Sequence, residues 1–193
     1  MADGLVLTHG AGGNAEAPLL MALATLFEGH GLAVQRYDLP YRQSRPKGPP
    51  RPPDAARDRA GLRQAAEAMR SLATGRLLLG GQSYGGRQAS ILAASEPGLL
   101  DALLLLSYPL HPPGKPGDQR TAHFPELRTP ALFVHGSVDP FGTLGEVEAA
   151  RTLIPARTQL LPIDGAGHDL LRRRAPAVAQ TIVAAFLEFI DYR

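Results

Sequence analysis

The chain has 193 residues, of which 44% are hydrophobic, and it contains no cysteine. This length suits one substantial core but is short for two ordinary domains, so residues 1–193 are predicted to form a single domain. The absence of cysteine excludes disulfide frameworks, thiolate nucleophiles and cysteine-ligated metal sites.

The formal net charge is only +2, and the positive residues are scattered apart from two small clusters. These clusters comprise Arg42, Arg45, Lys47 and Arg51 in the first half, and Arg172, Arg173 and Arg174 near the end. Clusters of this size are usually solvated surface, so we expect no nucleic-acid partner. Because no apolar stretch is long enough to span a membrane and no basic leader precedes the first apolar run, we expect a cytoplasmic protein without a membrane partner.

Short apolar runs alternate along the chain with longer segments of helical period. The predicted strands span residues 5–8, 33–37, 76–79, 102–106, 131–135 and 158–161. The predicted helices span residues 18–28, 54–72, 84–94, 143–153 and 175–190. Pro18 suits the first turn of the first helix, and Asp54 suits the N-cap of the second.

This alternation predicts an α/β fold, in which a doubly wound, mostly parallel sheet of about six strands carries helices on both faces. The strand cores are continuously apolar, as in residues 77–79 and 103–106, which is typical of strands covered on both sides. Ligands of such sheets bind beyond the carboxyl ends of the strands, so the motifs that matter are expected there.

Two irregular segments, residues 39–53 and 109–116, are rich in proline and are predicted to be extended surface loops. Together they carry six basic or histidine residues and no acidic one: Arg42, Arg45, Lys47, Arg51, His111 and Lys115. One interpretation is a positive pocket entrance that favours acyl substrates bearing a carboxylate or phosphate. The preferred interpretation is that these charges are solvated on the surface.

A G-x-S-x-G motif, residues 81–85, follows the predicted strand 76–79 directly and opens a predicted helix. The five letters alone are a weak signal, but the order of strand, sharp turn and helix is the one that lifts a serine hydroxyl above a sheet. Side chains at Gly81 or Gly85 would collide across such a turn. Ser83 is therefore the predicted nucleophile, whereas the alternative is a glycine-rich turn with an incidental serine.

A serine hydroxyl is a weak nucleophile without a base and an orienting acid, which in this arrangement follow in the order serine, acid, histidine. His168 lies in a glycine-containing segment just after the last predicted strand and is the predicted base, with His111 and His123 kept as alternatives. Asp139 follows the strand 131–135 and is the predicted acid.

Asp164 and Asp169 are the alternative acids, because they lie nearer His168 in the sequence. The histidines have no metal-ligand spacing such as H-x-x-x-H, so no metal and no cofactor are predicted. Residues 8–13 (THGAGG) follow the first strand and are predicted to supply an oxyanion donor, the N–H of Ala11, beside the N–H of Tyr84. The alternative for these residues is a flexible turn.

The whole chain resembles α/β-hydrolases of the dienelactone-hydrolase-like kind, and more closely the family of testis-expressed and chromatin-complex hydrolase-like proteins. The matching segments are residues 8–12 (THGAG), 81–87 (GQSYGGR), 107–115 (SYPLHPPGK) and 133–142 (FVHGSVDPFG). The resemblance implies the fold and implies Ser83, Asp139 and His168 as the triad. Dienelactone hydrolases proper have a cysteine where this chain has Ser83, so the resemblance implies no substrate.

Only about two dozen mostly polar, proline and glycine residues separate the strands 102–106 and 131–135, so no lid domain is expected. An open mouth suits a small soluble ester, thioester or amide better than a lipid. The sequence thus predicts a serine hydrolase that acts through an acyl-enzyme on a small-molecule acyl substrate. The alternative is a binding or scaffold protein that retains the fold without catalysis; the oligomeric state is not predicted.

Overall fold

A computed structural model of the protein describes residues 2–170 and 175–191. Within these ranges one sheet holds β1 (Gly4–Thr8), β2 (Ala33–Tyr37), β3 (Leu77–Gln82), β4 (Ala102–Leu106), β5 (Ala131–Gly136) and β6 (Thr158–Ile163). The strands lie in the order β2-β1-β3-β4-β5-β6, and every neighbouring pair is parallel. The predicted fold class is confirmed. The cluster Arg172 to Arg174 lies outside the described residues.

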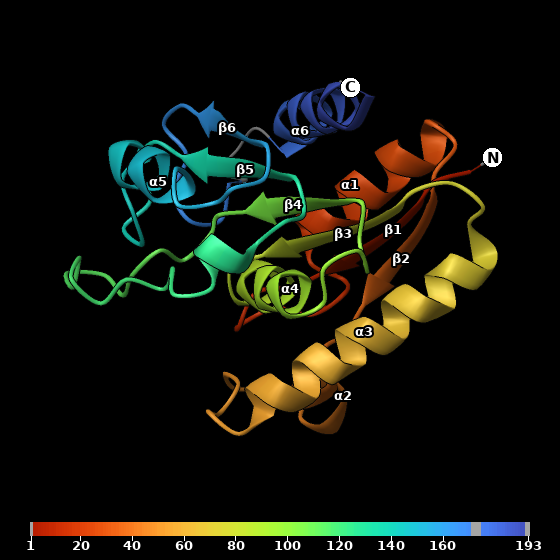
Figure 1. Cartoon of the computed structure of the whole chain (residues 1–193), viewed down its shortest axis with the longest axis horizontal. Helices are drawn as coiled ribbons and strands as arrows, with labels where there is room; N and C mark the ends of the chain where they lie inside the picture. The colour runs from red at the N-terminus through yellow and green to blue at the C-terminus, as the bar shows by residue number, and fades with distance from the viewer. Residues whose placement is uncertain (1, 171–174, 192–193) are drawn as a thin grey trace.

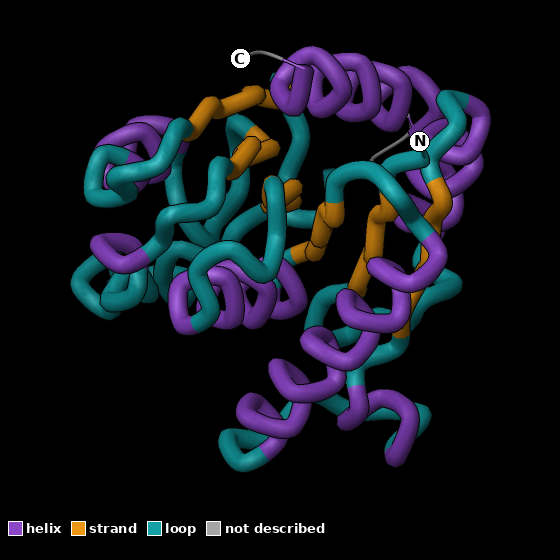
Figure 2. Tube along the Cα trace, turned by 45° about the vertical axis from the view of Figure 1, so that its right-hand side comes forward, coloured by secondary structure: helices purple, strands orange, loops and turns teal. Residues whose placement is uncertain are grey.

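Helices cover both faces of this sheet (Figures 1 and 2). They are α1 (Pro18–Gly29), α2 (Pro40–Ser44), α3 (Asp54–Leu72), α4 (Tyr84–Ser95), α5 (Leu144–Arg151) and α6 (Ala175–Asp191). The pair α1 and α6 packs on one face, and α3, α4 and α5 pack on the other. None of the helices in the described ranges is long and apolar enough to cross a membrane.

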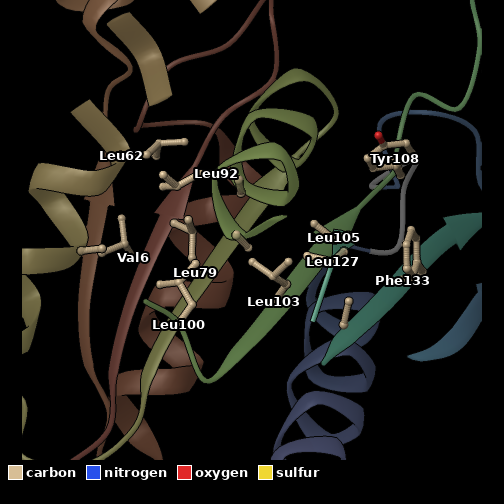
Figure 3. Packing of buried hydrophobic residues seen from close by; sticks show 14 of the residues in the cluster. Val6, Leu62, Leu79, Leu92, Leu100, Leu103, Leu105, Tyr108, Leu127 and Phe133 are labelled. Carbon is tan, nitrogen blue, oxygen red and sulfur yellow. The ribbon is translucent and has the colours of Figure 1, made fainter. Parts of the chain in front are cut away.

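Strand β4 shows how the apolar runs fill two cores. Successive strand side chains point to opposite faces. Leu103 and Leu105 therefore pack toward α3 and α4 (Figure 3), while Leu104 and Leu106 pack toward α1 and α6. All four are fully buried, and each contributes about 1.5–3 kcal/mol relative to an exposed leucine.

Two predicted local features are wrong. Asp54 is not an N-cap: α3 begins at Asp54 with Pro53 before it, and the Asp54 carboxylate instead accepts a hydrogen bond from the N–H of Arg51 and pairs with Arg45 and Arg57. Residues 39–53 are not a wholly extended surface loop. The proline at the first position of α2 starts a short helix there, because its fixed φ suits a helical first turn.

The side chains of α2 are held inside the molecule. Tyr41 is fully buried, and only 7% of Arg42 is exposed. The Arg42 guanidinium donates to the carbonyl oxygens of Ala11, Gly13, Arg45 and Gly48. The prediction that Arg42 is a solvated charge is therefore wrong, because four backbone acceptors replace the water around its head group.

The strand order places a topological switch point between β1 and β3. From β1 the chain runs outward to β2, then returns past β1 to β3 on the other side. After β1 and β3 the chain therefore turns to opposite faces of the sheet, toward α1 and α4 respectively. The two connecting segments border a crevice at the carboxyl ends of these neighbouring strands. These segments hold residues 10–13 and Ser83.

Residues 107–130 connect β4 to β5 and contain a single 3₁₀ turn, Phe124–Glu126, so the fold has no lid. Two hydrogen bonds close this connection at its base: the Tyr108 hydroxyl donates to the carbonyl oxygen of Arg120 at 2.7 Å, and the Arg120 N–H donates to that of Leu110 at 2.8 Å. Residues 113–119, beyond this closure, are exposed. The base is therefore fixed while the tip reaches into solvent.

Candidate active site

Ser83 stands alone between the last residue of β3 and the first residue of α4, with φ 49° and ψ −115°. A positive φ is uncommon for a residue with a side chain and is held here by the surrounding structure. The N–H of Ser83 donates to the carbonyl oxygen of Leu106 on the neighbouring strand at 2.8 Å. This turn projects the serine hydroxyl beyond the carboxyl end of the sheet.

The two glycines of the motif are required by close backbone approach. A Cβ on Gly85 would lie 2.5 Å from the carbonyl oxygen of His9, and a Cβ on Gly81 would overlap the backbone of Gly85 and Gly86. The predicted collision across the turn is thus confirmed. The sharp turn can form only when both positions lack a side chain.

The structure brings Ser83, His168 and Asp139 together. The Nε2 atom of His168 lies 2.8 Å from the Oγ atom of Ser83. Its Nδ1 atom lies 2.8 Å and 3.0 Å from the two carboxylate oxygens of Asp139. The Asp139 carboxylate therefore accepts a hydrogen bond from Nδ1–H, which leaves Nε2 as the acceptor for the serine hydroxyl.

Asp139 is held by its own loop beyond β5. Its side chain is fully buried, and the N–H of Phe141 donates to its Oδ1 atom at 2.9 Å. The Phe141 ring stacks on the imidazole of His168 with centroids 4.1 Å apart and planes at 28°. Phe141 fixes both the acid and the histidine, and sequence reasoning had given it no role.

The alternative residues lie elsewhere. The Asp164 carboxylate accepts from the Ser137 hydroxyl, and Asp169 is exposed at the cavity edge. The His111 imidazole contacts the carbonyl oxygen of Pro112 and the Glu146 carboxylate, and the Nε2 atom of His123 lies 2.8 Å from the Ser90 hydroxyl. Among the candidates, the geometry therefore selects Asp139 and His168 as the pair that faces Ser83.

Residues 10–13 pass directly beside the nucleophile, since a Cβ on Gly10 would lie 3.3 Å from that of Ser83. The Tyr41 hydroxyl lies 2.8 Å from the carbonyl oxygen of Ala11 and 3.2 Å from that of Gly10. The peptide bond between Gly10 and Ala11 is trans, so the N–H of Ala11 points to the side opposite the Gly10 carbonyl. Because Tyr41 holds the Gly10 carbonyl oxygen on its own side of the loop, the Ala11 N–H points to the other side of the loop.

His9 supports the same loop from within the protein. Its Nδ1 atom lies 2.8 Å from the carbonyl oxygen of Gly10, and its Nε2 atom accepts from the N–H of Leu39. Burial lowers the pKa of His9, so the neutral tautomer that makes both bonds is favoured. His9 is a structural brace in this geometry.

Asp58 on α3 joins this brace to the nucleophile turn. Its buried carboxylate accepts from the N–H of Tyr41 at 3.0 Å and from the Tyr84 hydroxyl at 2.8 Å. Burial, and then the hydrogen bond to Asp58, raises the pKa of Tyr84, so the phenol remains protonated. Tyr41 and Asp58 were missed by sequence reasoning, and Arg42 was assigned to the solvated surface, because their partners lie far along the chain.

A cavity of about 500 Å³ opens above the serine. It is lined by residues 10–13, Gln82, Ser83, Tyr84, Arg87, Pro109, Arg120, Phe141, His168 and Asp169. Of the two irregular segments, only Pro109 contributes, and within the described residues none of 39–53 lines the cavity. Its two guanidinium groups come instead from Arg87 and Arg120, which the sequence did not single out.

In the described ranges, no three histidine, aspartate or glutamate side chains lie close enough together to hold a metal ion. That no metal or cofactor is used stays a prediction.

The chain matches known proteins along nearly its whole length. Residues 2–189 match the family model described as alpha/beta hydrolase domain. A dienelactone hydrolase from Anabaena variabilis superposes with a TM-score of 0.75 at 22% identity, covering 97% of this chain and 87% of the other. An alpha-beta serine hydrolase homologue from Coxiella burnetii superposes with a TM-score of 0.76 at 18% identity, covering 95% and 84%.

Est1E from Butyrivibrio proteoclasticus, with ferulic acid bound, superposes with a TM-score of 0.77 at 16% identity, covering 98% and 90%. At these identities the three structures share the fold with this chain. The closer resemblance to the testis-expressed and chromatin-complex proteins stays a prediction. The family match over residues 2–189 shows that the chain belongs to the alpha/beta hydrolase domain family.

Proposed function

We propose that the protein is a serine hydrolase that cleaves a small soluble carboxylic ester or related acyl compound through an acyl-enzyme on Ser83. The observation that carries this proposal is the continuous chain of hydrogen bonds from the Ser83 hydroxyl through His168 to Asp139. A protein that only binds has no chemical need for this arrangement. The hydrolase neighbours support the same reaction class.

In the first half of the reaction, the Oγ atom of Ser83 attacks the acyl carbon while the Nε2 atom of His168 takes its proton. The imidazolium that forms is stabilised by the buried Asp139 carboxylate. His168 then gives the proton to the departing alcohol. In the second half, water attacks the acyl group while His168 takes a proton from that water, and His168 then returns the proton to the Oγ atom of Ser83 as the carboxylic acid leaves.

The negative charge that develops on the acyl oxygen is met by two backbone donors, the N–H groups of Ala11 and Tyr84. Tyr84 is the first residue of α4, where backbone N–H groups lack intrahelical partners and the helix dipole is positive. Ala11 is oriented by the contacts of its loop with Tyr41 and His9. Such pre-oriented donors are worth about 3–4 kcal/mol each in comparable enzymes.

The cavity supports a small substrate. A volume of about 500 Å³ falls in the range of drug-sized ligands, and no lid encloses a long lipid chain. The acyl substrate is the only partner proposed.

A fluorophosphonate probe tests the proposal directly. The wild-type protein is expected to be labelled at Ser83 and to hydrolyse 4-nitrophenyl acetate, and Ser83→Ala to lose both. Ser95→Ala, at the far end of α4, is the matched control that keeps both properties. Failure of the folded wild-type protein to take the label or cleave the ester would instead favour the binding or scaffold alternative.

A further inference from the structure

Two arginines, Arg87 and Arg120, line the cavity that contains Ser83. Arg87 lies on α4, four residues after Ser83, and its N–H donates to the carbonyl oxygen of Ser83. Residues four apart share a helix face, and their side chains lean toward the helix N-terminus. The rise between them is about 6 Å. The Arg87 side chain therefore leans toward the end of α4 that carries the serine, and both residues line the cavity.

Arg87 has no partner for its charge among the described residues. Its Nε atom is buried without a hydrogen bond, and no described carboxylate forms an ion pair with it. Other arginines are paired, for example Arg63 with Glu67 and Glu96, and Arg76 with Asp3 and Asp191. A buried donor without an acceptor is costly, and an incoming anion would relieve that cost.

Arg120 enters the cavity from the connection between β4 and β5. Its Nη1 atom makes a long hydrogen bond of 3.3 Å to the carbonyl oxygen of Pro109. Burial, and next the positive charge of Arg87, lowers the pKa of Arg120, while Tyr108 and then the exposed Asp118 oppose this lowering. The two guanidinium groups thus repel each other across one cavity.

The groups around the two arginines do not neutralise them. His123 is uncharged near neutral pH, because burial and then Arg87 lower its pKa to about 4. The only carboxylate among the described lining residues belongs to Asp169, which is exposed and pairs with neither guanidinium. Among the described lining residues, two guanidinium groups therefore stand against a single carboxylate, that of Asp169.

We propose that Arg87 and Arg120 form an anion-binding subsite, so that the natural substrate is an acyl compound with a second group that is a carboxylate or phosphate. This inference rests on the proposed hydrolase function and names its substrate class. Guanidinium groups present paired donors that match the oxygens of either anion. Because both arginines and Ser83 line one cavity of about 500 Å³, the linker between the anion and the reacting carbonyl is short.

Two pairs of esters test the subsite. 4-Nitrophenyl adipate, which carries a free carboxylate on its acyl chain, is compared with its methyl ester. 4-Acetoxybenzoate, which carries the carboxylate on its leaving group, is compared with methyl 4-acetoxybenzoate. In at least one pair the wild-type protein is expected to show a higher kcat/KM for the anionic ester, with a preference that weakens as salt rises.

The variants Arg87→Gln and Arg120→Gln are each expected to lower the anionic-to-neutral ratio of kcat/KM by about tenfold or more, the usual effect of losing a charge-assisted hydrogen bond. Arg63→Gln removes an arginine on the outer face of α3 and is expected to keep the wild-type ratio. Because Arg120 lies in the closed base of its connection, Arg120→Lys provides a second variant with the charge retained, and its ratio should fall less.

Inhibition separates the two anions: adipate and inorganic phosphate are each titrated as competitors of 4-nitrophenyl acetate, and the stronger identifies the preferred group. If an active wild-type protein shows the same kcat/KM for the neutral and anionic esters of both pairs, the subsite is overturned while the proposed hydrolase function stands. If no ester is cleaved, calorimetric titration of both anions into wild-type and Arg87→Gln protein decides independently. Binding lost in the variant supports the subsite, and no binding to the wild type overturns it.

Discussion

The Tyr41 hydroxyl lies 2.8 Å from the carbonyl oxygen of Ala11, although the two residues are 30 positions apart in the chain. This contact joins the short helix α2 to the loop that passes beside Ser83. Through this contact Tyr41, which does not line the cavity, can orient the backbone of Ala11, which does.

Tyr41→Phe is expected to lower kcat about tenfold with little change in KM, because the ring still fills its site while the Ala11 N–H loses its fixed direction. Tyr37→Phe, on β2, is the matched control. Steady-state kinetics with 4-nitrophenyl acetate measure the split, and thermal unfolding reports stability. A purely structural role would lower the unfolding temperature and leave kcat per folded molecule unchanged.

Asp139→Asn is expected to lower kcat about 10³–10⁴-fold, because the amide no longer stabilises the imidazolium and favours the wrong tautomer of His168. His168→Ala should cost nearly as much as Ser83→Ala, since the three residues act as a unit. Asp164→Asn is the control, because its carboxylate contacts Ser137 rather than His168. Activity within threefold of wild type in Asp139→Asn would remove Asp139 from the triad.

Gly85→Ala is expected to destabilise the protein by at least about 2 kcal/mol, since the new Cβ meets the rigid carbonyl oxygen of His9. Gly145→Ala is the contrasting variant. Its Cβ would meet no atom within 4 Å in the exposed first turn of α5, and it should stabilise by about 0.5–1 kcal/mol. Urea unfolding followed by circular dichroism measures whether the free energy of unfolding falls in Gly85→Ala and rises in Gly145→Ala.

The pKa of His123, lowered to about 4, predicts a pH dependence of stability. Above about pH 6.5 the residue is neutral in both folded and unfolded chains. As the pH falls from 6.5 to 4, His123 binds a proton in the unfolded chain but stays neutral in the folded protein, so the free energy of unfolding decreases. The loss from this group is at most about 3 kcal/mol.

His123→Gln keeps a hydrogen-bonding side chain beside Ser90 but cannot titrate, so its free energy of unfolding should fall less than that of wild type between pH 7 and 4. His30→Gln, at an exposed position, should follow wild type. Burial also lowers the pKa of His9 and His135, so a smaller residual decline is expected in the variant. Parallel curves for wild type and His123→Gln would contradict the assignment.

Much of the architecture could be predicted because each strand carries its own apolar run. Ser83 and Asp139 each follow such a run within a few residues, and His168 follows the last one. The ends of the strands were less predictable. Gly80 and Gly81 interrupt the apolar run, yet both continue the register of β3 beside Leu7 and Thr8.

The basic residues show why other features could not be predicted. Arg42 lies in a proline-rich segment, and its burial depends on the carbonyl oxygens of Ala11 and Gly13, about 30 positions away. Arg87 and Arg120 share a cavity only because β3 and β4 are neighbours in the sheet. No local periodicity encodes these tertiary contacts.

The hydrogen bonds that close the connection between β4 and β5 at Tyr108, Leu110 and Arg120 separate the tip at residues 113–119 from the cavity wall. An insertion into that tip adds chain beyond a fixed neck, and doubling a loop's length costs only about 0.6 kcal/mol. The tip is therefore the natural position at which to graft a cap over the cavity, so that substrate selection can be redesigned while the hydrogen-bonded chain from Ser83 to Asp139 stays intact.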